Sequence, residues 1–195
     1  VLSELHRTHV RIGSCQYMLS LTQLLVIRRR RRKDVTDGQN GGKFADAEAL
    51  AVAITAQWPE AEPGADALVV FTGGEPCLQL DAALLEAISA QGFETAIETN
   101  GTLPVPTQID WICVSPKPES TLVQQAGHEL KFVYPQETLS PEQFEHLDFE
   151  HFFLQPMDVD NEAMRWHNIQ AAIAYCLQNP QWRLSLQTHK IIGLD

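Results

Sequence analysis

The stretch VVFTGGEPCLQL, Val69 to Leu80, decides the fold. Its apolar run ends at Thr72, and two glycines, a carboxylate and a proline follow. Because the whole run 67–72 is apolar, we expect a strand that is buried on both faces, as in a parallel sheet. Glycines at the end of such a strand let a ligand approach the backbone closely. A Gly-Gly pair is often a plain turn, but a turn requires neither the acid nor the proline, so GGEP indicates a binding loop.

From about residue 36 onward the chain alternates between strand and helix patterns. Apolar runs predict strands at 67–72, 93–100, 109–116, 129–135, 151–157 and 182–189. Helical spacing predicts helices at 44–58, 80–92, 140–147 and 161–179, with Asp46, Ser140 and Asn161 as N-caps and Gly92 just after the second helix. This alternation is typical of βαβ units, so we predict an α/β fold with a parallel sheet.

Polar groups or glycines lie at the ends of five of the predicted strands, at 72–76, 98–101, 115–117, 155–158 and 187–190. The ends of parallel strands share one edge, where α/β proteins bind ligands. Glu75 offers a carboxylate for an ammonium group, whereas Ser115 and Lys117 suit a carboxylate. The backbone at 155–158 could pair with a base edge. Together these groups predict a site for an amino-acid–nucleoside conjugate.

Composition bounds the class of protein. The chain has 195 residues, 44% of them hydrophobic, and a net charge of −11, which suits one globular core. Residues 1–33 carry a net charge near +7 and residues 34–195 one near −18, which argues against a nucleic-acid surface on the acidic part. The sequence has no run of 18 apolar residues and so predicts no membrane span. The basic run 28–33 follows the apolar stretch before it, whereas the basic residues of a signal peptide precede its apolar stretch, so we expect a cytoplasmic protein. Four cysteines without shared spacing argue against disulfides or a zinc site.

Six motifs carry a resemblance to a known family. VVFTGGEPCLQLD, AIETNGTLPV, DWICVSPKP, ELKFVYPQ, FFLQPMDV and QWRLSLQTHK, in this order, resemble the 7-carboxy-7-deazaguanine synthases, a radical S-adenosylmethionine (SAM) family of the queuosine and 7-deazapurine pathway. The match covers about residues 36–190. The resemblance implies a partial (βα) barrel, with Thr72 as a substrate contact. It also implies a set of SAM-binding residues, namely Gly73, Gly74, Glu75, Ser115, Pro116, Lys117, Gln155, Pro156, Met157 and Asp158.

The resemblance also implies a reaction. Such an enzyme is a carbon–nitrogen lyase that converts 6-carboxy-5,6,7,8-tetrahydropterin to 7-carboxy-7-deazaguanine with loss of ammonia. Its cofactors are SAM, a [4Fe-4S] cluster and Mg²⁺. Its partners are the pterin substrate, a second copy of the chain as a homodimer, and a flavodoxin-type electron donor.

Residues 1–35 depart from the family pattern. The family's three cluster cysteines precede the loop that matches 36–44, but here this region holds one cysteine, Cys15, as a candidate ligand without the family spacing. We interpret 1–35 as a divergent basic segment, shifted in frame or disordered, and 36–195 as the core domain with a degraded first-strand region. Asp195 is a candidate for the family's C-terminal substrate contact, and no catalytic residue is assigned. Two alternatives stay open, namely an inactive, cluster-less remnant that still binds SAM and a binding module that uses its basic tail.

Overall fold

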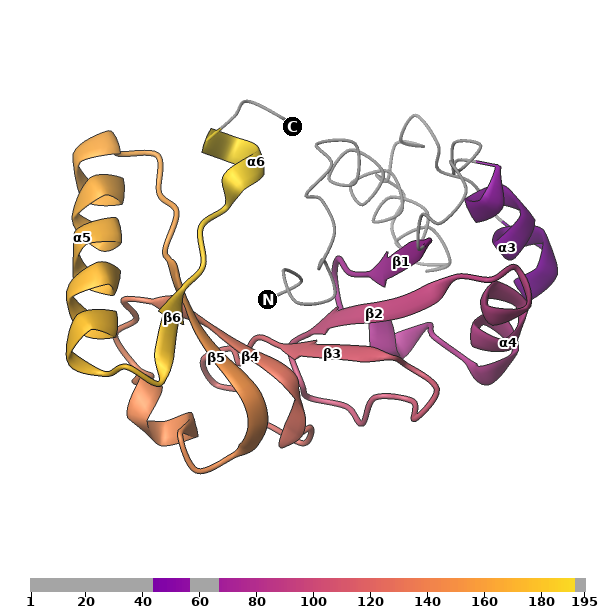
Figure 1. Cartoon of the computed structure of the whole chain (residues 1–195), viewed down its shortest axis with the longest axis horizontal. Coiled ribbons are helices and arrows are strands. Elements are labelled where there is room, and N and C mark those ends of the chain that lie inside the picture. Colours follow the sequence, from indigo (N-terminus) through magenta and orange to yellow (C-terminus); the bar gives the residue numbers. More distant parts are fainter. Residues whose placement is uncertain (1–43, 57–66, 192–195) are drawn as a thin grey trace.

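The computed structural model describes residues 44–56 and 67–191 (Figure 1). The basic segment 1–35, Cys15 and Asp195 lie outside these described residues. No helix in the described ranges has the length and apolar character that a membrane span requires.

A six-stranded, all-parallel sheet forms the centre of the molecule. Its spatial order β1-β2-β3-β4-β5-β6 follows the sequence, and every neighbouring pair is parallel. The strands are β1 (Leu68–Phe71), β2 (Glu94–Thr99), β3 (Trp111–Val114), β4 (Ala126–Tyr134), β5 (Asp148–Pro156) and β6 (Trp182–Leu184). The sheet is curved, with β1 and β6 at its two ends (Figure 1). The predicted α/β class and parallel sheet are therefore confirmed.

The helices begin where the sequence supplies a capping side chain. They are α3 (Ala47–Thr55), α4 (Ala82–Ala90), α5 (Glu162–Gln178) and α6 (Thr188–Ile191), with short 3₁₀ turns η1 (Pro76–Leu78) and η2 (Pro141–Phe144). Asp46 accepts from the Ala49 N–H at 2.8 Å, and Asn161 accepts from the Met164 N–H at 2.9 Å. Such side chains satisfy N–H groups that the helix itself leaves without a partner. Both caps were predicted and are confirmed.

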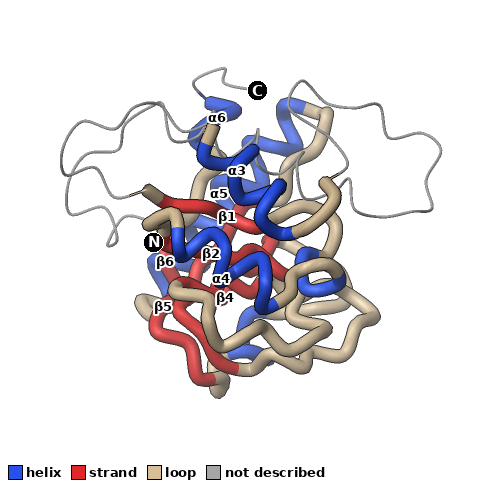
Figure 2. Tube along the Cα trace, turned by 90° about the vertical axis from the view of Figure 1, so that its right-hand side faces the viewer, coloured by secondary structure: helices blue, strands red, loops and turns tan. Residues whose placement is uncertain are grey.

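Helices cover one face of the sheet through two hydrophobic clusters. The first joins α3 and α4 to β1 and β2, with Leu50, Leu84 and Phe71 almost fully buried. The second joins α5 and η2 to strands β3 to β6 around Leu154 and Trp182. Figure 2 shows α3 and α4 in front of the strands, and Figure 1 shows α5 at the opposite end of the sheet. The strands are thus held from one side, and their ends stay available for a site.

Two predicted elements differ from the structure. The predicted helix at 140–147 is only the 3₁₀ turn η2, and the strand predicted at 182–189 ends at Leu184. The Ser185 N–H still donates to the Leu154 carbonyl at 2.8 Å. The next hydrogen bond between the two strands would need the backbone N–H of residue 156 on β5 as its donor. This residue is Pro156, which has no N–H. The chain therefore leaves the sheet and forms α6.

Candidate functional site

The carboxyl ends of all six strands lie at one edge of the sheet, because every strand runs in the same direction. This edge carries Thr72 after β1, Ser115 and Lys117 after β3, and Gln155 near the end of β5. Three strands lie between β1 and β5, so these side chains are spread along the edge in a row. The row is curved because the sheet is curved (Figure 1). The structure thus places predicted site residues from three strands along the same edge.

Glu75 joins the ends of two strands. One carboxylate oxygen accepts from the Thr99 hydroxyl at 2.7 Å and from the Cys77 N–H at 3.1 Å. The other oxygen accepts from the Asn100 N–H at 2.9 Å. The carboxylate therefore caps η1 and fixes the tip of β1 against the tip of β2. Its contact with a ligand ammonium group stays a prediction, since these bonds give it a positioning role.

The two glycines before Glu75 shape the loop. Gly73 has a φ of 81° and Gly74 a φ of 55°, in the left-handed region that favours glycine. A Cβ built on Gly74 would meet nothing within 4 Å. At Gly101, after β2, a Cβ would instead come within 2.6 Å of the Leu122 side chain. Gly74 thus borders open space at the strand edge, whereas Gly101 is needed for close packing.

Lys117 and Ser115 contact each other after β3. The Lys117 ammonium donates to the Ser115 hydroxyl at 2.7 Å. Desolvation lowers the pKa of Lys117 from its ordinary value, and the positive charge of Lys131 lowers it further. Glu98 and Glu75 act in the opposite direction on the same pKa. The charged groups of β1, β2, β3 and β4 are therefore close enough to interact at this edge.

A second charged pair lies within the strands, and sequence reasoning missed it. Lys131 on β4 contacts Glu98 on β2 at 2.7 Å, across β3. Burial lowers the pKa of Lys131, but the negative charge of Glu98 and its hydrogen bond with Lys131 act in the opposite direction, and the pKa lies above its ordinary value. Beside them, the Trp111 ring N–H donates to Glu129 at 2.8 Å. A lysine between two apolar residues in ELKFVY was the available signal, because charged side chains are rarely buried without a partner.

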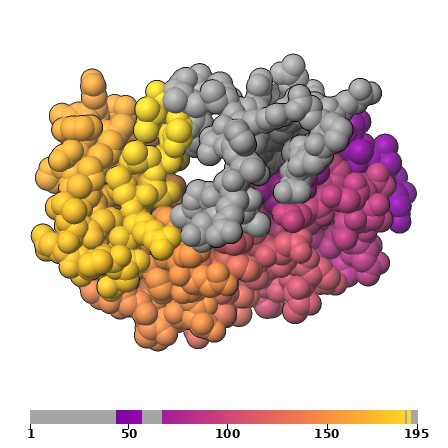
Figure 3. Space-filling model, in the orientation of Figure 1, coloured from indigo at the N-terminus to yellow at the C-terminus, as the bar shows by residue number. Residues whose placement is uncertain are grey.

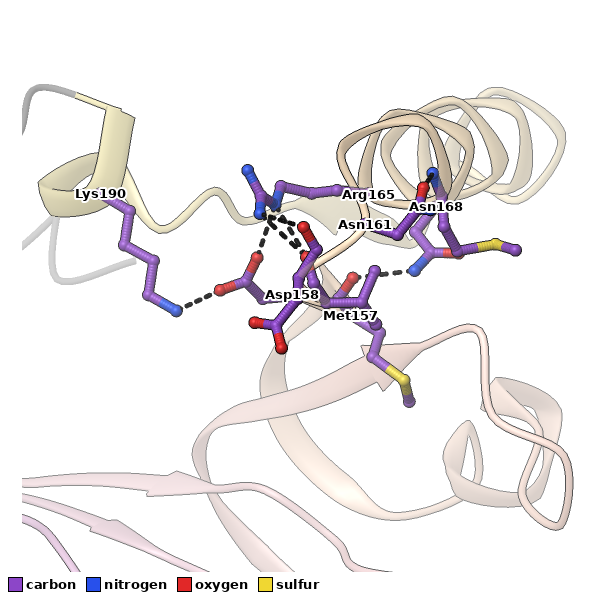
Figure 4. Close-up of polar contacts among 9 residues, drawn as sticks. Met157, Asp158, Asn161, Arg165, Asn168 and Lys190 are labelled. Atoms are coloured by element: carbon purple, nitrogen blue, oxygen red, sulfur yellow. Dashed lines mark hydrogen bonds and ion pairs between the residues drawn. The ribbon is translucent and has the colours of Figure 1, made fainter.

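The segment after β5 is tied to two helices (Figure 4). Asp158 accepts from Arg165 of α5 at 2.9 Å and also pairs with Lys190 of α6. The Met157 carbonyl accepts from Asn168 at 2.9 Å, and the Met157 N–H donates to the Tyr134 carbonyl at 2.7 Å. The Met157 N–H and the Asp158 carboxylate are therefore engaged within the protein, so a base contact at 155–158 must use other groups of this segment.

The site suits SAM better than it suits an iron–sulfur cluster. Open space beside Gly74, together with the paired Ser115 and Lys117, fits an amino-acid moiety. Among the described residues, no three His, Cys, Asp or Glu side chains lie together as metal ligands. Burial raises the pKa of Cys77 to about 11 and that of Cys113 to about 12, so both groups are neutral thiols at neutral pH in this structure. The described part of the chain therefore does not supply a set of three cluster ligands.

The fold and the groups at its edge define an α/β protein of the partial-barrel, radical SAM type. No protein-family model matches the chain. The 7-carboxy-7-deazaguanine synthase of Bordetella pertussis is 65% identical over 159 residues, which are 82% of this chain and 73% of the relative. That of Caulobacter vibrioides is 59% identical over 160 residues, with the same coverage. The chain belongs to the 7-carboxy-7-deazaguanine synthase family.

A solved structure supports this assignment. The crystal structure of QueE from Escherichia coli is similar with a TM-score of 0.55 and 28% sequence identity. The likeness covers 73% of this chain and 64% of that chain. The chain thus spans somewhat less than two thirds of the solved relative.

Proposed function

We propose that this chain acts as a 7-carboxy-7-deazaguanine synthase of queuosine biosynthesis, a carbon–nitrogen lyase that acts on 6-carboxy-5,6,7,8-tetrahydropterin with loss of ammonia. The observation that carries the proposal is the row of polar groups along one carboxyl edge of an all-parallel sheet, in a chain 65% identical to a synthase of that name. A cytoplasmic location, a flavodoxin-type electron donor and pairing with a second copy complete the proposal.

The described residues would bind and orient SAM. Glu75 holds the Gly73–Gly74 loop in place through Thr99, so that the backbone at Gly74 can face the ligand's amino-acid moiety. Lys117 and Ser115 offer a cation and a hydroxyl to its carboxylate. Thr72 is the proposed substrate contact. SAM supplies the hydrogen-abstracting chemistry of this family, and we assign no step to a cluster that the described residues do not fit.

Calorimetric titration with SAM tests the binding site directly. We expect Gly74→Ala to weaken SAM binding about tenfold or more, because its Cβ would enter the open space beside the loop. Gly92→Ala is the matched control, since Gly92 also has a positive φ and open surroundings but follows α4, away from the strand ends. Equal SAM affinity of the two variants, or no measurable SAM binding by the wild type, would contradict the site.

Product analysis tests the reaction. The full chain is treated anaerobically with iron and sulfide and then incubated with SAM, dithionite and 6-carboxy-5,6,7,8-tetrahydropterin. We expect 7-carboxy-7-deazaguanine and ammonia in equal amounts. A protein that binds SAM but stays colourless and forms no product would limit this chain to cofactor binding.

A further inference from the structure

Asn100 directly follows β2, at the edge of the sheet that carries the proposed SAM site. Its backbone N–H donates to one oxygen of Glu75 at 2.9 Å. The carbonyl of the preceding residue, Thr99, accepts from the Ser115 N–H at 2.8 Å. Asn100 therefore lies between the loop after β1 and the residues after β3, which are the two groups proposed to hold the amino-acid moiety of SAM.

The carboxamide of Asn100 is held in one orientation by Thr102. Its Oδ1 atom accepts from the Thr102 N–H at 2.8 Å and from the Thr102 hydroxyl at 2.7 Å. A backbone N–H can only donate, so the amide atom that it meets must be the oxygen and not the nitrogen. Local bonds of this kind define an Asx turn. The turn thus fixes which side of the carboxamide carries Nδ2.

The Nδ2 group of Asn100 is left with two unused N–H donors. It has no hydrogen-bond partner among the residues that the structure describes, although the side chain is half-buried. The acceptors next to it are occupied, since Glu75 accepts three hydrogen bonds and the Gly101 carbonyl accepts from the N–H groups of 123 and 124. A half-buried amide donor normally has a partner, so this position is suited to a ligand atom that accepts.

Asn100 also belongs to the face of the sheet that the helices leave free. Side chains alternate between the two faces along a strand. Ile97 packs in the cluster of α3 and α4, so Glu98 and Asn100 belong to the opposite face. The hydrogen bonds between β2 and β3 continue to the residue before Asn100, which extends the alternation to this position. Lys117 is close enough to Glu98 for the charge of Glu98 to raise its pKa. Asn100 and Lys117 therefore serve the same part of the edge.

The donor character of Nδ2 selects the part of the ligand that it can meet. The amino-acid moiety of SAM has an ammonium group, which only donates, and a carboxylate, which only accepts. Ser115 and Lys117, on the neighbouring strand end, are the groups proposed for that carboxylate. We infer, on the basis of the proposed function, that the Asn100 Nδ2 group donates a hydrogen bond to the carboxylate of SAM and makes the site selective for an intact amino-acid moiety.

Calorimetric titration of the full chain with two ligands, SAM and decarboxylated SAM, tests this contact. Asn100→Asp keeps an oxygen for Thr102 but replaces the donor with a negatively charged acceptor. We expect its affinity for SAM to fall about 30-fold or more, because a hydrogen bond to a charged group is lost and two carboxylates meet. Decarboxylated SAM lacks the contacted group, so it should bind this variant as tightly as the wild type or more tightly.

Asn179→Asp is the matched control, because it makes the same substitution and the same change of charge. Asn179 follows α5 and precedes β6, so it belongs to the amino ends of the strands. Helix α5 also lies across the molecule from β1 and β2 (Figures 1 and 3). This control should bind both ligands like the wild type.

Asn100→Ser separates the loss of the donor from the added charge. A serine hydroxyl can still accept from the Thr102 N–H in a local turn, but it is neutral and shorter than the carboxamide. We expect about tenfold weaker binding of SAM and unchanged binding of decarboxylated SAM. Urea unfolding of each variant shows whether the fold is kept, and Asn100→Ser carries the test if Asn100→Asp does not fold.

Two results would overturn this inference while the proposed function stands. One is a SAM affinity of Asn100→Asp and Asn100→Ser equal to that of the wild type. The other is an equal loss of affinity for SAM and for decarboxylated SAM, because Asn100 would then act on the shape of the loop or on another part of the ligand. A wild type that does not bind SAM would instead contradict the proposed function, and the contact of Asn100 with it.

Discussion

At the scale of single residues, Glu75 has the largest structural consequence. Its carboxylate accepts three hydrogen bonds from two strand ends, and Thr99 among the donors is buried. Glu75→Gln would replace one acceptor oxygen with an amide donor, so that one N–H or O–H group loses its partner. We expect the free energy of unfolding to fall by about 1–3 kcal/mol.

Urea denaturation measures this change. Glu86→Gln on α4 is the matched control, because it makes the same substitution at an exposed position and should alter stability by less than about 0.5 kcal/mol. If Glu75→Gln were as stable as Glu86→Gln, the three hydrogen bonds would not hold the two strand ends together.

The thiol of Cys77 provides a prediction about pH. Burial and then the negative charge of Glu75 raise its pKa to about 11, and the hydrogen bond with Thr99 only partly opposes this. At pH 8 only about one thiol in a thousand is therefore ionised, and the thiolate is the reactive species. We expect iodoacetamide labelling of Cys77 to be slow at pH 8 and to rise about tenfold per pH unit up to pH 10.

Mass spectrometry of peptides that contain Cys77 checks this dependence. The same peptide labelled in urea is the control, because an unfolded thiol has a pKa near 8.5 and should react quickly at pH 8. Fast labelling of the folded protein at pH 8 would show that the thiol is ionised, and Cys77 would then have to be reconsidered as a metal ligand.

At the scale of elements, Asp158 ties the end of β5 to α5 and α6. The hydrogen bond from Lys190, followed by the charges of Lys190 and Arg165, holds the pKa of Asp158 below its ordinary value. Because the pKa of the Asp158 carboxyl is lowered in the folded protein, the tie contributes fully above the unfolded value near 4 and is lost as the pH falls through the lowered pKa of the folded state. The tie is therefore present at neutral pH.

We expect Asp158→Asn to loosen α6 without unfolding the protein. Amide hydrogen exchange at 188–191 should become several-fold faster at pH 7, whereas the free energy of unfolding changes by less than about 1 kcal/mol, because these ion pairs are exposed. Asp160→Asn is the control, since among the described contacts only the backbone carbonyl of Asp160 meets Arg165. Unchanged exchange in Asp158→Asn would assign the position of α6 to other contacts.

Most elements were predictable because their patterns are local. The apolar runs of β1 to β5 and the caps Asp46 and Asn161 can be recognised from residues that are close together in the sequence. The end of β6 was not predictable in this way, since it depends on a missing N–H at Pro156 of the neighbouring strand. The length of η2 was not predictable either, because Ser140 and Pro141 are typical of a helix start but the helical segment ends after Phe144.

The candidate site was predictable in outline. Residues after β1, β3 and β5 lie at one edge because parallel strands require it. Their longer-range contacts were not predictable, since Thr99 lies 24 positions from Glu75 and Lys190 lies 32 positions from Asp158. The pairing of Glu98 with Lys131 likewise depends on which strands are two places apart in the sheet.

At the scale of the whole molecule, the two larger hydrophobic clusters of the core meet at β3. Ile112 packs against both hydrophobic clusters, one around α3 and α4 and the other around α5. Side chains in different clusters should therefore contribute independently to stability. We expect Ile88→Val to cost about 0.5–1.5 kcal/mol and Leu154→Ala about 2–5 kcal/mol.

The double variant tests this independence. Its loss of unfolding free energy should equal the two single losses within about 0.5 kcal/mol. Ile112→Val combined with either variant is the comparison, because it contacts both clusters and should deviate from additivity. A large coupling between Ile88 and Leu154 would show that the two clusters behave as one core.

The hydrogen bonds of Glu75 have a further consequence for ligand recognition. Its bonds to Thr99 and Asn100 already exist without a ligand, so the loop 73–75 keeps its shape before any encounter. A molecule that docks there freezes few additional torsions, and the entropy lost on association is correspondingly small. Much of the intrinsic contact energy is then retained as affinity.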